Sequence, residues 1–172
     1  MQHATTHVPV HTHAPAADVQ QGIVYGFEYD CVEKIRPEYL GREEIRDVVG
    51  RAASLCRIPL PEIVFGGDRT WPCLADVRAW RITINDWGRS PTTVLHEIAH
   101  LVTFAEPRGR MEMMRGQAHG PVFVRNAITL YADFLGVRRS RLERRAQEFG
   151  LEIAPAIVED APPTGSFYEG EF

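Results

Sequence analysis

The sequence predicts an α+β domain in which a small, mainly antiparallel sheet packs against several helices. Three observations favour this class: helical periodicity after Pro37 and again after Gly120, a group of short strand patterns between them, and a long apolar run without Gly or Pro from Thr92 to Ala105. At 172 residues, the chain is long enough for one domain with tails.

Composition narrows the functional classes. The formal net charge of −4 argues against general nucleic-acid binding, although a local basic patch remains compatible with it. No run of eighteen apolar residues indicates a membrane span, and no apolar segment near the amino terminus indicates a secretory signal. Cys31, Cys56 and Cys73 are widely spaced, as expected of free thiols in a reducing compartment. A cytoplasmic location is therefore expected.

Both ends of the chain are expected to be disordered tails around a domain at residues 21–150. Residues 1–20 are rich in His, Pro, Ala and Thr and show no periodicity. Residues 151–172 are acidic and contain two adjacent prolines. Four histidines lie in the first tail, and we interpret them as solvated residues outside the structured site: His3, His7, His11 and His13.

The first half of the domain contains most of the strand patterns. Residues 23–27 are interpreted as a short strand, and the stripe from Ile45 to Cys56 predicts a helix that ends before Pro59. Glu62–Phe65 is a strand stopped by two glycines. Residues 74–77 and 80–85 are predicted to form a hairpin.

The second half is mainly helical. Ser90 and Pro91 suit the cap and first turn of a buried helix, which Pro107 and Gly109 end. Residues 106–118 are expected to form a mobile loop. A long helix then begins at Pro121 and stops at Gly136, and a last helix runs over residues 140–149.

The buried helix carries the motif His96-Glu97-Ile98-Ala99-His100. Positions four apart lie on nearly the same helix face, so His96 and His100 point the same way, and two such imidazoles suit one zinc ion. Glu97 lies beside them, within reach of a water on that ion. Since apolar residues surround the motif, its polar side chains need partners.

A catalytic zinc site needs a third protein ligand and an open position for water. His119 is the other histidine in the structured part of the sequence, and it stands at the start of a long helix. We therefore predict His119 as the third ligand, with Glu112 as the alternative. Glu106 lies at the end of the same helix as the motif, which disfavours it.

Three neutral imidazoles would leave the metal positively charged, which acidifies a bound water. The sequence thus predicts a zinc endopeptidase in which Glu97 is the general base. The strand before the helix is expected to pair with an extended substrate through Arg81, Thr83 and Asn85. Arg125 and Tyr131 are candidate oxyanion donors.

His96-Glu97-Ile98-Ala99-His100 followed by His119-Gly120-Pro121-Val122-Phe123 resembles the SprT-like (Spartan) zinc metalloproteases, which pair HExxH with a later HGPxF or HGPxW. The resemblance covers roughly residues 37–137. It implies a compact zincin-like fold, a Glu97-dependent protease and, as substrates, proteins crosslinked to or bound on DNA.

Two features depart from that family. No cysteine follows Phe149, so the zinc ribbon that many relatives carry is missing from this sequence, and Val122 stands where an acidic residue is common. The local substitute for a DNA contact is an arginine cluster: Arg138, Arg141, Arg144 and Arg145. An alternative function is a non-catalytic, zinc-containing binding or regulatory module, but the presence of Glu97 favours the enzyme.

Overall fold

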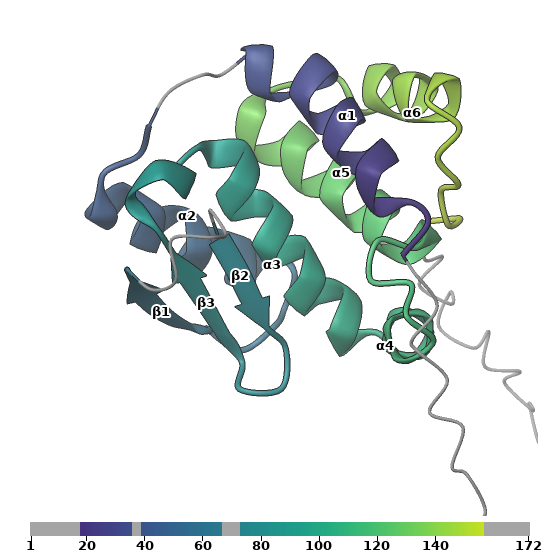
Figure 1. Cartoon of the computed structure of the whole chain (residues 1–172). Coiled ribbons are helices and arrows are strands. Elements are labelled where there is room, and N and C mark those ends of the chain that lie inside the picture. The colour runs from purple at the N-terminus through teal and green to yellow at the C-terminus, as the bar shows by residue number, and fades with distance from the viewer. Residues whose placement is uncertain (1–17, 36–38, 67–72, 157–172) are drawn as a thin grey trace, which may run out of the picture.

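The computed structural model describes residues 18–35, 39–66 and 73–156, and within these ranges the fold is α+β (Figure 1). The helices are α1 (Gln21–Cys31), α2 (Arg42–Leu55), α3 (Pro91–Ala105), α4 (Pro107–Met114), α5 (Pro121–Leu135) and α6 (Arg139–Glu148). The strands are β1 (Glu62–Phe65), β2 (Cys73–Asp76) and β3 (Arg81–Ile84). Short 3-10 turns span Glu33–Ile35 and Asp86–Gly88. The four tail histidines lie outside the described residues.

The three strands form a mixed sheet in the order β1-β3-β2. β3 is antiparallel to β2, as the predicted hairpin requires, but it inserts between β2 and β1 and is parallel to β1. The expectation of a mainly antiparallel sheet is therefore wrong for one of the two pairings. The arrangement leaves β2 as the sheet edge that faces α3 (Figure 1).

Helix α3 is the centre of the fold, with α5 packed along it and α2 and β2 on its other sides (Figure 1). It begins as predicted: Ser90 Oγ accepts a hydrogen bond from the Thr93 amide at 3.2 Å, and Pro91 occupies the first turn. Leu95, Ile98 and Leu101 are almost completely buried. The site motif is thus on a deeply buried helix.

Helix α1 corrects the expectation of a strand over residues 23–27. Val24, Phe27 and Cys31 are buried at three- and four-residue steps, which is a helical period. Cys31 and Cys73 are buried and Cys56 is half-buried, and all three are free thiols as expected. The helix lies across α5, beside α6 (Figure 1).

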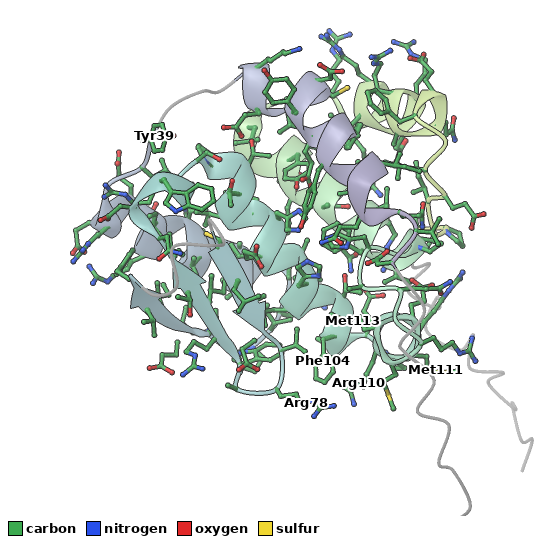
Figure 2. All side chains as sticks on the ribbon, in the orientation of Figure 1. Tyr39, Arg78, Phe104, Arg110, Met111 and Met113 are labelled. Atoms are coloured by element: carbon green, nitrogen blue, oxygen red, sulfur yellow. The ribbon has the colours of Figure 1, made fainter. Side chains whose placement is uncertain are left out.

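The expected loop at residues 106–118 contains helix α4. Its Arg110 guanidinium lies over the Phe104 ring, 4.9 Å from the centroid, and Nε donates to the Phe104 carbonyl at 3.0 Å (Figure 2). α4 is thereby attached to the end of α3. This fixes the path of the chain from the motif to His119.

The segment after α6 also differs from expectation, because residues 151–155 pack on the domain. Leu151 and Ala154 are buried, and the Ala154 amide donates to the Pro121 carbonyl at 3.0 Å. The boundary predicted at residue 150 is therefore too early. No helix among the described residues is long and apolar enough to cross a membrane.

Candidate metal centre

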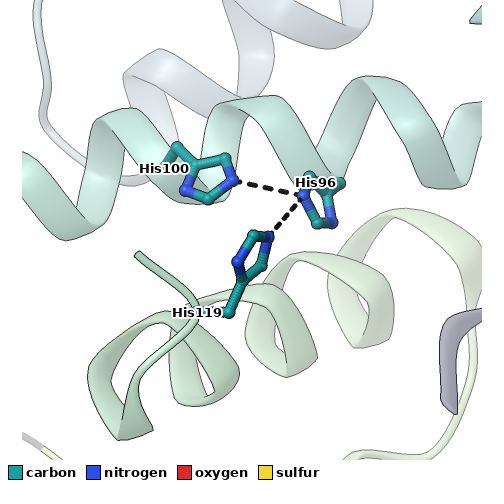
Figure 3. Close-up of side chains that lie close together, drawn as sticks. All are labelled: His96, His100 and His119. Atoms are coloured by element: carbon teal, nitrogen blue, oxygen red, sulfur yellow. Dashed lines mark hydrogen bonds between the residues drawn. The ribbon is translucent and has the colours of Figure 1, made fainter. Parts of the chain in front are cut away.

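Three imidazoles converge between α3 and the start of α5 (Figure 3). His96 and His100 come from successive turns of α3, and His119 immediately precedes Gly120, the cap residue of α5. His96 Nε2 lies 3.2 Å from His100 Nε2 and 3.2 Å from His119 Nε2. One ligand atom from each residue lies within 4.8 Å of the other two, so the three histidines are close enough to bind one metal ion.

The hydrogen bonds behind two of the rings explain this orientation. His96 Nδ1 lies 2.8 Å from Glu28 Oε1, and His119 Nδ1 lies 2.7 Å from Asp18 Oδ2. A carboxylate accepts, so each Nδ1 carries the proton and each Nε2 keeps its lone pair. Lone pairs that face one another at 3.2 Å require a shared cation or a proton.

The spacing suits a metal ion. A tetrahedral zinc with Zn–N bonds of about 2.05 Å would separate its ligand nitrogens by about 3.3 Å. Histidine ligands backed by carboxylates are also the usual construction of such sites, since the carboxylate fixes the ring and raises its basicity. The residues present therefore fit a resident metal.

Burial keeps two of the three rings neutral. The pKa of His100 is well below its usual value because the ring is buried and faces His96 and His119. Burial and His96 likewise lower the pKa of His119, against the opposing effect of Asp18. For His96, burial lowers the pKa but Glu28 outweighs it, so the net shift is upward. His100 Nδ1 is buried with no hydrogen-bond partner among the described residues.

Helix α1 supplies the parts of the site that the sequence analysis did not identify. Glu28, buried at 7 % exposure, accepts from His96 and also from the Tyr131 hydroxyl at 2.6 Å. The Tyr25 ring lies 5.5 Å from the His96 ring and 5.6 Å from the His119 ring, measured between centroids. The helical spacing of these buried residues could have revealed α1 in the sequence: Val24, Phe27, Glu28 and Cys31.

Asp18 is a further omission, since it falls inside the expected tail at residues 1–20. Its Oδ2 accepts from both the ring and the backbone amide of His119, at 2.7 and 2.8 Å. Gln20 caps α1 and accepts from the Glu152 amide at 3.2 Å. The ordered domain therefore begins at least as early as Asp18.

Glu97 lies beside the three imidazoles. It lines a cavity of about 290 Å³ together with all three histidines, Tyr25 and Met113, whose position appears in Figure 2. Its Oε2 accepts from the Ala75 amide of β2 at 2.7 Å. Burial raises the pKa of Glu97 against the opposing effects of His96 and that amide. A carboxylate with a raised pKa is suited to accept and return a proton near neutral pH.

The strand that was expected to pair with a substrate lies inside the sheet. β3 pairs with β1 on one side and β2 on the other, so the backbone around Arg81 and Thr83 has no free edge for a peptide. Asn85 lies just beyond this strand and is buried. β2 is the sheet edge beside the metal centre, and its residues from Cys73 to Ala75 line the 290 Å³ cavity.

The other candidate residues have different roles. Glu112, the alternative ligand, accepts from the Val122 amide at 3.0 Å and so caps α5. Arg125 donates to Glu106 at 2.6 Å, and Tyr131 is buried behind Glu28. Neither Arg125 nor Tyr131 lines the cavity, so both are removed as oxyanion donors.

The arginine cluster lies at the junction of α5 and α6. Arg138, Arg141 and Arg144 line a hollow of about 490 Å³ and have no carboxylate partner in the described parts of the chain. Arg145 instead pairs with Glu148. The hollow is at the opposite end of α5 from His119, a helix length of roughly 22 Å.

No protein-family model, curated protein or solved structure matches this chain. The function is therefore argued from the site itself.

Proposed function

We propose that this protein is a zinc-dependent endopeptidase of zincin-like architecture, with His96, His100 and His119 as metal ligands and Glu97 as general base. The observation that carries the proposal is the position of Glu97 in the same cavity as the three convergent imidazoles. A purely structural zinc site has no use for a buried carboxylate at that place. The likeness of the two motifs to SprT-like proteases supports the same reaction.

When bound, zinc would supply a Lewis acid that polarises a peptide carbonyl and acidifies a water. In the proposed reaction, Glu97 accepts a proton from the attacking water as the water oxygen bonds to the carbonyl carbon. Glu97 then gives the proton to the amide nitrogen while the carbon–nitrogen bond breaks, which releases a carboxylic acid and an amine. Because Ala75 fixes one carboxylate oxygen, the other is the oxygen that moves the proton.

The edge of β2 is the proposed binding strand. An extended peptide laid along Cys73 to Ala75 would pass the Glu97 carboxylate and form main-chain hydrogen bonds, which depend little on sequence. Tyr25 stands over His96 and His119 and is the proposed hydroxyl donor to the carbonyl oxygen, in place of Arg125 and Tyr131.

The Glu97→Gln variant tests the proposal. We expect it to bind one zinc per chain but to lose peptide cleavage by about 10²- to 10⁴-fold, since only the proton transfer is removed. Glu43→Gln, at an exposed position on α2, is the matched control and should keep full activity. Casein and a DNA-bound histone are suitable substrates. Equal cleavage by wild type and Glu97→Gln would refute the catalytic role, and zinc binding without cleavage by wild type would favour the regulatory module.

A further inference from the structure

A second cavity, of about 270 Å³, adjoins the metal centre on the other side of Tyr25. It shares Tyr25, Cys73, His96 and Glu97 with the first cavity, so the two meet at the catalytic carboxylate. Its volume is just below the range of about 300–1,000 Å³ for pockets that hold whole ligands. A space of this size suits one side chain of a bound peptide.

The lining of this cavity is acidic. Glu28, Glu33 and Glu97 all contribute to it, and none of its lining residues is Lys or Arg. If a divalent ion is held by three neutral imidazoles, Glu28 and Glu97 balance its charge. Glu33 then remains as an uncompensated carboxylate, which favours a positively charged occupant.

Glu33 is held in place but keeps one free oxygen. Its Oε2 accepts from the Ser90 hydroxyl at 3.1 Å, which ties the 3-10 turn to the start of α3. Its Oε1 has no hydrogen-bond or ion-pair partner within the described part of the chain. A fixed carboxylate with an open oxygen is a ready acceptor for an ammonium or guanidinium group.

Thr92 gives an independent indication of a ligand. It lines the same cavity at 4 % exposure, and its buried hydroxyl has no partner in the described residues. A buried hydroxyl without a partner destabilises the fold, so its retention calls for an explanation. A hydrogen-bond donor brought in by a substrate would satisfy it.

The aromatic residues that line the cavity suit the apolar stem of a Lys or Arg side chain. Tyr25 and Tyr29 line the cavity, and Lys34 of this chain already lies over the Tyr29 ring at 4.7 Å from its centroid. Aromatic faces accept cations and cover the methylene stem of Lys or Arg. Lys34 itself is tied to Asp30 and does not line the cavity.

We propose that this acidic cavity is a specificity subsite that takes a Lys or Arg side chain of the peptide next to the scissile bond, with Glu33 as the specificity-determining residue. The inference rests on the proposed peptidase function and adds a substrate class to it. Glu97 remains available for proton transfer, because the cationic group pairs with Glu33 and Thr92.

The test uses the zinc-loaded full chain and quenched fluorescent peptides that differ only in one residue beside the cleaved bond: Lys, Arg, norleucine or Glu. We expect kcat/KM for Lys and Arg to exceed that for norleucine by about tenfold or more, the worth of one charged hydrogen bond. Glu33→Gln should reduce this ratio to about twofold, and Glu33→Lys should make Glu the preferred residue. An unchanged ratio in both variants overturns the proposal.

Two further variants separate specificity from folding. Thr92→Val removes a buried hydroxyl that has no partner in the described residues, so it should keep or raise thermal stability while it lowers the preference for Lys. Glu43→Gln on exposed α2 should keep the wild-type ratio. Loss of the ratio in Glu43→Gln would show that it does not depend on the cavity.

A peptide-binding experiment separates failure of the proposed subsite from failure of the proposed peptidase function. The Glu97→Gln protein and the double variant Glu97→Gln/Glu33→Gln are titrated with labelled Lys and norleucine peptides by fluorescence anisotropy. About tenfold tighter binding of the Lys peptide, lost in the double variant, supports the subsite even if no peptide is cleaved. Equal binding of both peptides, or no binding of either, overturns it.

Discussion

Two carboxylates near the start of the described residues hold two of the three imidazoles. Asp18 and Glu28 each accept from an Nδ1 atom, and Glu28 also binds Tyr131. Neither carboxylate touches the position of the metal. Their contribution is to fix the ring and its tautomer, which makes each a positioning residue.

We expect Asp18→Asn and Glu28→Gln to weaken zinc binding by about 10- to 100-fold, because each removes the charge behind a ligand. The zinc dissociation constant, measured by competition with a coloured chelator, checks this. Asp30→Asn is the control, since Asp30 lies on α1 but pairs with exposed Lys34. Affinity within twofold of wild type in both variants would contradict the assigned role.

At this scale, the sequence predicted which three histidines form the cluster but not the carboxylates that hold two of them. His96 and His100 follow from helix periodicity alone, and His119 follows from its fixed place at a helix start. The roles of Asp18 and Glu28 could not be predicted in this way, because their contacts with His119 and His96 span 101 and 68 positions of the sequence. Contacts between residues so far apart leave no local pattern in the sequence. Glu112, the alternative ligand in the sequence analysis, instead accepts a hydrogen bond from the Val122 amide.

At the scale of helices and strands, the close packing of α4 against α3 depends on a glycine. A Cβ on Gly109 would lie 2.3 Å from the Thr103 carbonyl oxygen and 2.9 Å from Val122 Cγ1. Both neighbours are buried parts of α3 and α5, so α4 would have to move away. That movement would displace the chain that leads to His119.

We expect Gly109→Ala to destabilise the protein by about 1–3 kcal/mol and to weaken zinc binding, as overpacking does. Gly50→Ala is the matched control: Gly50 is also helical, and a Cβ there meets nothing within 4 Å. It should stabilise α2 by about 0.5–1 kcal/mol. Urea unfolding of both variants measures the difference. Gly109→Ala as stable as Gly50→Ala would show that α4 does not pack as described.

Helices and strands were predicted correctly where the apolar residues recur with one clear period. The patterns of α2, α3, α5 and α6 are long and regular, and the two-residue alternation of β3 is clean. α1 failed because aromatic and β-branched residues over 23–27 favour a strand locally, while burial against α5 and α6 makes a helix. The central place of β3 was equally hidden, since strand order depends on contacts between distant segments.

For the whole molecule, the candidate metal centre joins segments that lie far apart in the sequence. Its ligands come from α3 and the start of α5, and their carboxylate partners come from Asp18 and α1. Bound zinc would therefore favour the folded state over the unfolded chain, in which these groups are dispersed.

Zinc at a thousandfold excess over its dissociation constant should stabilise the fold by about 4 kcal/mol. For a chain of this size, that corresponds to a rise in Tm of about 8–16 °C. Calorimetry with zinc and with a chelator measures it. His100→Ala should abolish the rise, and a rise that persists in His100→Ala would place the stabilising zinc at another site.

The arginine hollow at the far end of α5 gives the last prediction. Arg138, Arg141 and Arg144 surround it without acidic partners in the described residues, although the whole chain carries a net charge of −4. A local concentration of unpaired cations in an acidic protein favours a polyanion such as DNA. The hollow lies about one helix length from His119, so a duplex bound there would be held apart from the three histidines.

Replacement of these three arginines by Gln should therefore weaken DNA binding while cleavage of a short peptide stays at the wild-type rate. Each lost phosphate contact should reduce the slope of log affinity against log salt by about one. Arg46→Gln/Arg51→Gln on α2, where both arginines pair with acidic residues, is the control. DNA binding that is undetectable in the wild type at low salt would remove DNA as a partner. Binding with unchanged salt dependence in the triple variant would place the contact elsewhere on the surface.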